Sequence, residues 1–214
     1  CEKPLVLNLR NLDGLSKMEM ETKHRVFNIL QLRVHPSIIK LKNAIDLSKK
    51  KSKYDVDLTY ITSRGEWYLQ SWKGDTKKSG GIATNIGIHF FDMLHFVFGK
   101  LQQNITHLLE PKKASGYLEY EKARVRWYLS LNRDDIPNNE INEGKTTYRS
   151  ITVDGKELEF SGGFTDLHLK SYQEVLNGNG FTLEDSRTAI KTVSEIRDAK
   201  IIHSKSDQHP FMKS

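Results

Sequence analysis

The chain has 214 residues, of which 37% are hydrophobic and 28% are charged, and its formal net charge is +6 at pH 7. A chain of this length can bury one sizeable core or two small ones, and a composition without a long apolar run is typical of a soluble protein that does not cross a membrane. Cys1 is the only cysteine, which excludes an intramolecular disulfide and favours a reducing, cytoplasmic location.

The basic excess, 33 Lys and Arg against 27 Asp and Glu, favours anionic partners. Its densest run lies at residues 49–53, where a predicted helix gives way to a predicted strand. No aromatic residue interleaves with these lysines, as binding of a single-stranded nucleic acid would require. We therefore predict a solvated loop and no nucleic-acid partner, whereas an anionic small molecule remains compatible with the charge.

The N-terminal third of the chain carries the patterns of two helices and two strands. Residues 11–25 are polar and helical, and residues 26–34 have the β-branched and apolar character of a buried strand. Pro36 suits the first turn of a helix predicted over residues 37–49. Residues 54–64 alternate as a strand does. The side chains on one side of that strand are Val56, Leu58, Tyr60 and Thr62.

Residues 65–75 combine aromatic and polar side chains before a turn-like end. Trp67, Tyr68 and Trp72 fall within this short stretch. Two interpretations stay open, because these rings can cap the core or can form a wall against a sugar or a base.

Residues 80–99 predict a helix that is largely buried. Asn85, His89 and Asp92 share one face, because separations of four and three residues return to the same side of a helix. This polar stripe is either a satisfied part of the core or a site in which His89 moves a proton near neutral pH and its neighbours orient it. The apolar row of the helix consists of Ile86, Phe90, Met93 and Val97.

The C-terminal half begins with two predicted hairpins. The first spans residues 116–132 and alternates clearly. The second joins strands at residues 146–153 and 157–161 through Asp154 and Gly155, a strong short turn signal. Consecutive hairpins of this kind predict an antiparallel sheet.

Two helices close the predicted fold, at residues 165–176 and 183–202, and the last dozen residues are predicted to be frayed. The fold class is therefore α/β (α+β), a mainly antiparallel open sheet with helices on one face. The buried row of the last helix is predicted to consist of Ala189, Val193, Ile196 and Ala199.

Two of these stretches resemble the Gfo/Idh/MocA family of oxidoreductases. Residues 2–4, Glu-Lys-Pro, match one signature of that family. Residues 80–92 match another, with a Gly-Gly pair followed by Asn85, His89 and Asp92. The family usually has Asp where this chain has Asn85.

Five further segments narrow the resemblance, namely residues 31–36, 71–75, 79–85, 148–153 and 162–168. In this order they are similar to the family members that act on UDP-N-acetylglucosaminuronate in bacterial O-antigen and lipopolysaccharide synthesis. The resemblance covers nearly the whole chain, and within this branch an Asn in place of the usual Asp is expected.

The resemblance also implies a division of the chain. Residues 1–35 would be the tail of a dinucleotide-binding Rossmann domain, and residues 36–214 a substrate-binding and oligomerisation domain. Because the sequence contains no G-x-G-x-x-G motif, we expect the main pyrophosphate loop to lie outside this chain and the chain alone to be inactive. A homodimer or homotetramer through the uncovered face of the sheet is a further expectation.

The implied reaction oxidises the C3 hydroxyl of the sugar by hydride transfer to NAD. Transfer of the hydride leaves the hydroxyl proton to be removed, and His89 is the candidate base. Lys3 would stabilise the alkoxide-like oxygen and Asn85 would hold the sugar by neutral hydrogen bonds. Lys3 would also border the cofactor, together with Glu2 and Pro4. No cluster of His, Cys, Asp and Glu has the spacing of metal ligands, so no metal is expected.

Basic side chains would bind the anionic groups of such a substrate. Arg33, Arg64 and Lys73 lie close to the family segments and are candidates for the diphosphate and the carboxylate, with a solvated surface charge as the alternative for each. The other residues that we place at the substrate are Trp72, Thr84, Asn85, Asp92, Thr165 and His168.

Two alternatives to this function stay open. The first is a dehydrogenase of another UDP-sugar. The second is a non-catalytic sugar-binding or assembly protein on the same scaffold. The presence of Lys3 and His89 favours an enzyme, since the loss of either would have supported the second alternative.

Overall fold

A six-stranded sheet with the strand order β2-β3-β4-β1-β5-β6 organises the computed structural model, which describes residues 1–160, 162, 164–204 and 206–212. Four neighbouring pairs of strands are antiparallel and β1 pairs with β4 in parallel. The predicted mainly antiparallel sheet is therefore confirmed, with one parallel pair that was not predicted. The strands are β1 (Tyr54–Thr62), β2 (Leu101–Leu109), β3 (Lys113–Tyr120), β4 (Ala123–Ser130), β5 (Thr147–Val153) and β6 (Lys156–Glu157).

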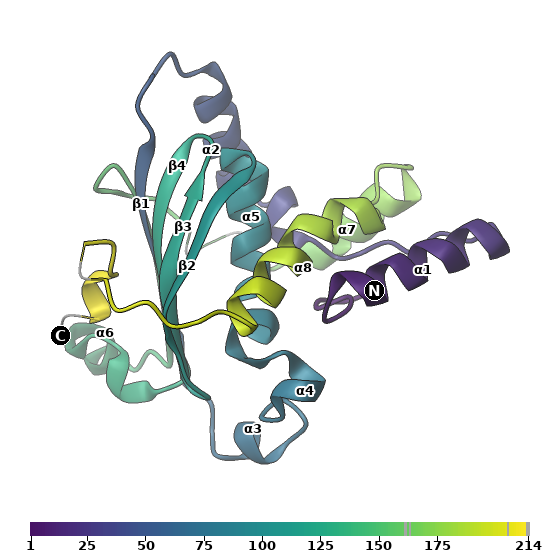
Figure 1. The fold of residues 1–214 in the computed structure, drawn as a ribbon. Coiled ribbons are helices and arrows are strands. Elements are labelled where there is room, and N and C mark those ends of the chain that lie inside the picture. Colours follow the sequence, from purple (N-terminus) through teal and green to yellow (C-terminus); the bar gives the residue numbers. More distant parts are fainter. Residues whose placement is uncertain (161, 163, 205, 213–214) are drawn as a thin grey trace.

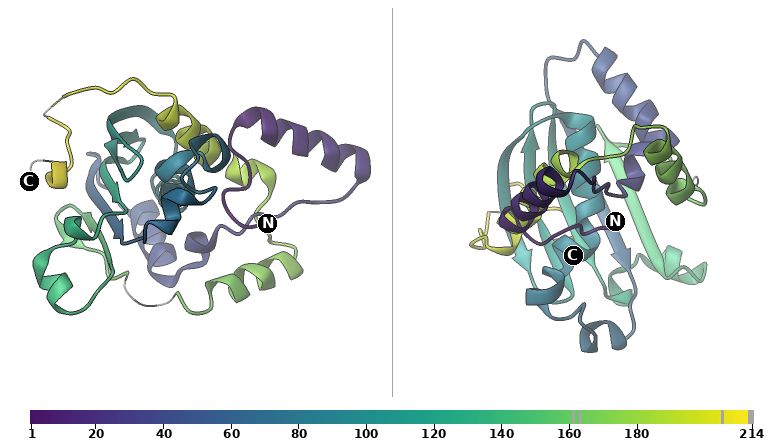
Figure 2. Two further views of the ribbon diagram at one scale, coloured as in Figure 1. Left: turned by 90° about the horizontal axis from the view of Figure 1, so that it is seen from below. Right: turned by 90° about the vertical axis from the view of Figure 1, so that its right-hand side faces the viewer.

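Helices α2, α5 and α8 cover one face of the sheet, and α1 lies outside them against α8 (Figures 1 and 2). The predicted one-sided arrangement is thereby confirmed. The helices are α1 (Leu9–Thr22), α2 (Pro36–Leu47), α3 (Trp67–Gln70), α4 (Thr76–Ser79), α5 (Ile88–Phe98), α6 (Asn138–Asn142), α7 (Leu167–Leu176) and α8 (Leu183–Arg197). Four shorter helical turns are η1 (Gln31–Val34), η2 (Ala83–Gly87), η3 (Arg133–Asp135) and η4 (Pro210–Met212), of which η2 is π-helical.

Side-chain caps explain where two of these helices begin. The backbone N–H of Ser37 donates to His35 Nδ1 at the start of α2, and Pro36 occupies the first turn as predicted. Thr182 and Asp185 form a capping box at the start of α8. No helix within the described part of the chain has both the length and the apolar character that crossing a membrane requires.

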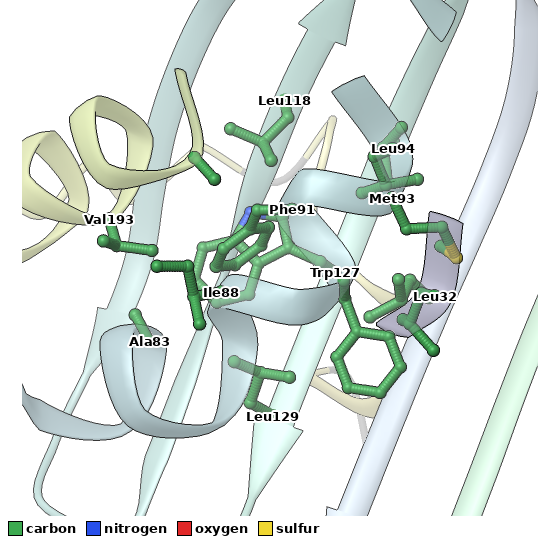
Figure 3. Packing of buried hydrophobic residues seen from close by; sticks show 14 of the residues in the cluster. Leu32, Ala83, Ile88, Phe91, Met93, Leu94, Leu118, Trp127, Leu129 and Val193 are labelled. Carbon is green, nitrogen blue, oxygen red and sulfur yellow. The ribbon is translucent and has the colours of Figure 1, made fainter. Parts of the chain in front are cut away.

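Close packing of α5 on the sheet forms the centre of the core (Figure 3). The ring of Phe91 meets that of Trp127 edge-on, with 5.1 Å between centroids. A Cβ on Gly87 would lie 2.7 Å from Cε2 of Phe91 and 2.8 Å from Cδ1 of Leu129. Glycine at this position therefore lets the helix approach the strands closely, which fixes the height of the polar stripe above the sheet.

The predicted hairpins are present, although the second is shorter than predicted. The turn between β5 and β6 has positive φ angles at Asp154 (49°) and Gly155 (75°), as a tight hairpin turn requires. β6 contains only Lys156 and Glu157, so the strand predicted over residues 157–161 is wrong at residues 158–160. Residue 161 lies outside the described part of the chain.

Residues 26–34 do not form the predicted strand. The backbone N–H groups of Asn28 and Ile29 donate to the carbonyls of Phe181 and Cys1, and the chain then turns into η1. Ile29 and Leu32 are buried because this segment packs beneath helices, where η1 contacts α2, α5 and α7. Apolar, β-branched residues therefore reflect burial here and not a ladder of hydrogen bonds.

Strand β2 was not predicted. It forms one edge of the sheet, where Gln102 and Gln103 are exposed. Its register against β3 also shifts twice. A strand is recognised in a sequence by the alternation of apolar and polar residues. An exposed edge strand with irregular pairing lacks this alternation.

The last dozen residues were predicted to be frayed, but His209 and Phe211 among them are packed against the face of the sheet that the helices leave uncovered. His209 is buried, donates to Thr59 Oγ1 over 3.1 Å and stacks on Tyr128. Phe211 lies against the rings of Tyr128 and Tyr148. The predicted last helix ends earlier than expected, at Arg197. The predicted row of α8 is buried at Ala189, Val193 and Ile196, whereas Ala199 lies beyond the helix and is half-buried.

Candidate active site

A cavity of about 250 Å³ lies between the N-terminal segment, α5 and the strands β1 and β5. Several residues predicted from the sequence line it, and the structure thus brings together Glu2, Lys3, Arg64, His89 and His168. The remaining lining residues are Gln31, Leu32, Tyr60, Ile86, Phe90, Arg149 and Phe164.

Lys3 is held at this cavity by the helix that carries His89. Its ammonium donates to the backbone carbonyl of Asn85 over 2.8 Å. Asn85 belongs to η2, and a π-helical turn displaces carbonyls from the regular pattern of α-helical bonds. Burial lowers the pKa of Lys3; Glu2 opposes this shift, and the cation of Lys73 adds to it.

His89 is neutral at pH 7 in this environment. Burial lowers its pKa to about 3, and the nearby cation of Lys3 and the imidazole of His168 contribute in the same direction. Its Nε2 lies 3.4 Å from Nε2 of Gln31. Because the amide nitrogen of Gln31 can only donate, His89 Nε2 is the acceptor and the ring proton lies on Nδ1. His89 therefore presents a lone pair at the cavity.

Asn85 is linked to the aromatic stretch of residues 65–75. Its Nδ2 donates to the hydroxyl of Tyr68 over 2.6 Å, and Tyr68 is buried. Burial raises the pKa of Tyr68, so the phenol keeps a proton that it can donate onward. Trp67 and Trp72 are more than half exposed and do not cap the core. The ammonium of Lys73 lies 5.4 Å from the ring of Trp67.

Arg33 does not serve as a substrate-binding cation, and that prediction is corrected. Its Nε and Nη2 donate to the two carboxylate oxygens of Asp92 over 3.0 and 2.8 Å, and its Nη1 donates to Asp185 over 3.1 Å. The guanidinium is also enclosed between the rings of Phe96 and Phe181. All three nitrogens of the Arg33 guanidinium group donate to other residues of the chain. Arg33 therefore connects η1 to Asp92 on α5 and to Asp185 on α8.

The prediction of Asp92 as a substrate ligand is corrected for the same reason. Its side chain is only 2% exposed and both its oxygens accept from Arg33. Thr84 is fully buried, with its hydroxyl unpaired among the described residues, and does not line the cavity. Thr165 and Pro4 are likewise not among the lining residues, although Pro4 directly follows Lys3.

Sequence reasoning missed three polar residues of the cavity: Gln31, Tyr60 and Arg149. Two of them could have been found. Tyr60 and Arg149 are register partners in β1 and β5, and strand alternation places their side chains on one face. Gln31 carried no such signal, because the segment that contains it does not form the predicted strand.

A histidine anchors the rim of the cavity. His35 donates from Nε2 to the carbonyl of Gly162 over 2.8 Å, and its ring lies against Phe160 and Phe164. Burial lowers the pKa of His35, with Arg149 acting in the same direction and the Gly162 carbonyl opposing it. The neutral ring thus joins the start of α2 to the segment that follows β6.

Within residues 1–160, 162, 164–204 and 206–212, no group of three His, Cys, Asp or Glu side chains is arranged to hold a metal ion. The charges that line the cavity are instead mostly positive. Glu2 is the carboxylate among them, and it lies 3.0 Å from His168 Nε2. The arrangement suits an anionic organic ligand placed against a neutral imidazole.

Known proteins share this arrangement of sequence and fold. The family model described as "Oxidoreductase family, C-terminal alpha/beta domain" (Gfo/Idh/MocA) matches residues 52–143. The inositol 2-dehydrogenase of Rhizobium meliloti (strain 1021) is 29% identical over 111 residues. That match covers 50% of this chain and 31% of the length of the relative.

A solved dehydrogenase gives a more extensive match. The structure of the WlbA (WbpB) dehydrogenase of Thermus thermophilus in complex with NAD and alpha-ketoglutarate has a TM-score of 0.92 and 48% identity. It covers 98% of this chain, which spans 68% of that protein. The complex of the same enzyme with NAD and UDP-GlcNAcA has a TM-score of 0.91 and 47% identity, covering 98% of this chain and 67% of that one.

Proposed function

Because the chain belongs to the Gfo/Idh/MocA oxidoreductase family, we propose that it provides the substrate-binding part of an NAD-dependent dehydrogenase that oxidises the C3 hydroxyl of UDP-N-acetylglucosaminuronate. The observation that carries the proposal is the 47% identity, over 98% of the chain, to a dehydrogenase in complex with NAD and UDP-GlcNAcA. In this proposal residues 1–35 belong to a dinucleotide-binding unit and residues 36–214 form the substrate unit of a bacterial enzyme of O-antigen synthesis.

His89 takes the role of the base. Its imidazole is neutral at pH 7 because burial lowers its pKa, so Nε2 is free to accept the hydroxyl proton when the substrate displaces the contact to Gln31. A hydroxyl at that position lies beside the ammonium of Lys3. The positive charge of Lys3 stabilises the oxygen as its proton leaves and thus compensates for the low basicity of His89.

Bound NAD would supply the acceptor for the hydride. Lys3 and Glu2 of this chain border the cavity from the N-terminal segment, which fits a position between sugar and cofactor. The chain has no G-x-G-x-x-G motif, so its own residues do not account for binding of the cofactor's pyrophosphate.

Asn85 positions the sugar in this proposal. Its Nδ2 is occupied by Tyr68, which leaves its carbonyl oxygen as an acceptor for a sugar hydroxyl or amide. Asn85 does not itself line the cavity at His89, to which Arg64 adds positive charge for an anionic substrate. A neutral amide in the place of an Asp avoids an additional negative charge beside that substrate.

One structure of the relative from Thermus thermophilus is a complex with NAD and alpha-ketoglutarate. We propose that a small dicarboxylate oxoacid uses the same cation-lined cavity after the sugar has left. Hydride and proton would then return to its keto carbon and oxygen and produce a 2-hydroxy acid, with NAD regenerated.

The proposal also includes a cytoplasmic homo-oligomer that associates through the uncovered face of the sheet. That face carries the bidentate pair between Arg126 and Asp57, with distances of 2.6 and 2.7 Å, beside the packed C-terminal segment. A sheet face without covering helices can stay solvated, and in this proposal a second subunit covers it.

Substitution of His89 tests the proposal in the intact enzyme. His89→Ala is expected to lower turnover of UDP-N-acetylglucosaminuronate by about two to four orders of magnitude, the usual contribution of a positioned acid–base group, with little change in KM. His24→Ala, at an exposed position after α1, is the matched control. Near-normal turnover of His89→Ala would mean that His89 is only a satisfied residue of the core.

The substrate is tested separately. Turnover of UDP-N-acetylglucosaminuronate is compared with that of UDP-N-acetylglucosamine, which lacks the carboxylate. Equal kcat/KM values would remove the sugar acid from the proposal and leave the dehydrogenase of another UDP-sugar. Absence of NADH formation with any UDP-sugar, although binding persists, would favour a non-catalytic sugar-binding protein.

A further inference from the structure

Arg149 on β5 is a cation of the cavity that has no carboxylate partner in the described part of the chain. It forms no ion pair with any described residue, and its Nε is buried without a hydrogen-bond partner among those residues. Buried donors are ordinarily satisfied, because an unmade hydrogen bond leaves the cost of desolvation uncompensated. A guanidinium nitrogen in this state beside a cavity indicates that a ligand completes its bonding.

Aromatic rings hold the guanidinium in place. Its Cζ lies 4.2 Å from the ring centroid of Phe164, 5.3 Å from that of Tyr60 and 5.5 Å from that of Phe160. These contacts orient the planar fork without using its N–H donors. The arrangement lowers the entropy that is lost when an anion binds, since the side chain is already restricted.

Arg149 also lies where two cavities meet. It lines the 250 Å³ cavity at His89 and a second cavity of about 540 Å³ along β5 and β6. A volume of 250 Å³ is slightly below the usual range of roughly 300–1,000 Å³ for sites that enclose a whole ligand of drug size. A nucleotide sugar therefore needs space beyond the first cavity, and the second one begins at Arg149.

Two acidic residues of the second cavity, Glu140 and Glu157, are bound by groups other than Arg149. Glu140 accepts from Lys145 over 2.6 Å, and Glu157 accepts from the hydroxyl of Ser150 over 2.8 Å and from the backbone N–H of Ile151 over 3.2 Å. Neither of these two carboxylates forms an ion pair with Arg149.

We propose that Arg149 binds an anionic group of the substrate, a phosphoryl group or a carboxylate, at the junction of the two cavities, so that the sugar lies at His89 and the rest of the nucleotide sugar extends along β5 and β6. The inference rests on the proposed function for the identity of the substrate. The binding of the anion, however, requires neither NAD nor hydride transfer.

Calorimetry on this 214-residue protein provides the test. UDP-N-acetylglucosaminuronate and UDP-N-acetylglucosamine are titrated into the unsubstituted protein, Arg149→Met, Arg149→Lys and the control Arg124→Met. Arg124 lies on β4, on the opposite face of the sheet, and is exposed, so its substitution removes the same charge far from the cavity. Thermal unfolding of each variant shows that it is folded.

Arg149→Met is expected to weaken binding about tenfold to a hundredfold, the usual loss when a charge-assisted hydrogen bond is removed, whereas Arg124→Met leaves affinity unchanged. Arg149→Lys keeps the positive charge but loses the two parallel N–H donors of the guanidinium group. Its affinity should lie between those of Arg149→Met and the unsubstituted protein. Equal loss for both ligands identifies the diphosphate as the bound group. Loss for the sugar acid alone identifies the carboxylate.

If Arg149→Met is folded and binds both ligands with unchanged affinity, the inference is wrong, even when turnover is normal. It is also wrong if the unsubstituted protein binds neither ligand. Conversely, weakened binding by Arg149→Met in an intact protein that forms no NADH would support the inference while the proposed dehydrogenase activity fails. The two proposals can therefore fail independently.

Discussion

Two arginines of this chain have similar aromatic surroundings and different electrostatic ones. The guanidinium of Arg33 lies 5.4 Å from the ring of Phe96 and 5.3 Å from that of Phe181. That of Arg149 lies 5.3 Å from the ring of Tyr60 and 4.2 Å from that of Phe164. Only the first has carboxylates, because Asp92 and Asp185 bind its fork. Arg149 has none among the described residues.

The difference teaches that aromatic packing orients an arginine but does not decide its role. Where carboxylates from other helices complete the fork, the cation joins elements of the fold, as Arg33 joins η1 to α5 and α8. Where the fork opens into a cavity, the missing anion has to come from a ligand. The consequences for stability should therefore differ sharply between the two positions.

The largest expected effect is on stability at Arg33. Arg33→Met should lower the free energy of unfolding by about 3–5 kcal/mol, because it leaves the buried Asp92 without its counter-charge. Urea denaturation measures the loss. Arg187→Met is the control, since Arg187 pairs with exposed Glu184 and Asp13 at the surface and should cost at most about 1 kcal/mol. Equal losses at the two positions would contradict a structural role for Arg33.

A smaller effect is expected at Arg149. Arg149→Met should change the free energy of unfolding by less than about 1 kcal/mol or raise it, because an apolar side chain replaces a cation that forms no ion pair with any described residue. The same urea series provides the measurement. A loss as large as that of Arg33→Met would make Arg149 a structural residue and remove the contrast between the two regions.

The pH dependence separates the two regions further. Burial opposes a charge on Asp185, but hydrogen bonds from Thr182 and the cation of Arg33 outweigh it and lower the pKa of Asp185. A carboxyl with a depressed pKa stabilises the fold above its unfolded value, near 4, and this contribution is lost as the pH falls through the folded pKa. The contribution of Asp185 should therefore be lost only in acid.

The Arg149 region should begin to weaken at a less acidic pH than Asp185 does, because of His35. Burial lowers the pKa of His35 in the folded chain. Below about pH 6.5 the unfolded chain therefore binds a proton that the folded chain does not, and the free energy of unfolding decreases as the pH falls. Because Arg149 contributes to that lowering, Arg149→Met should raise the pKa of His35. An NMR titration of the His35 ring measures this shift, the smallest of the expected effects. An unchanged pKa would show that the two side chains are electrostatically independent.

Local signals made much of the fold predictable. Pro36 marked the start of α2, and the turn at Asp154 and Gly155 marked the hairpin of β5 and β6. In both cases the conformation depends on the covalent structure of one or two residues. The parallel pairing of β1 with β4 had no such local signal, because it depends on which distant strand occupies the neighbouring position.

The candidate site was predictable where helical spacing determines it. Asn85 and His89 share a face because they are four residues apart on a helix, and Lys3 was placed beside them by the family resemblance. The role of Arg33 was not predictable, because Asp92 and Asp185 reach it from two other helices. For the same reason no sequence pattern distinguished Arg33 from Arg149.

The central position of β1 has a consequence for how the protein folds. β1 precedes α5 and the β2–β4 hairpins in the chain, yet it pairs with β4 on one side and β5 on the other. These pairings close long loops, whose entropy cost slows folding relative to the local hairpins. The cavity needs Tyr60 from β1, His89 from α5 and Arg149 from β5. We therefore expect the ability to bind a ligand to be acquired late in folding, with the slow closure of the sheet around β1.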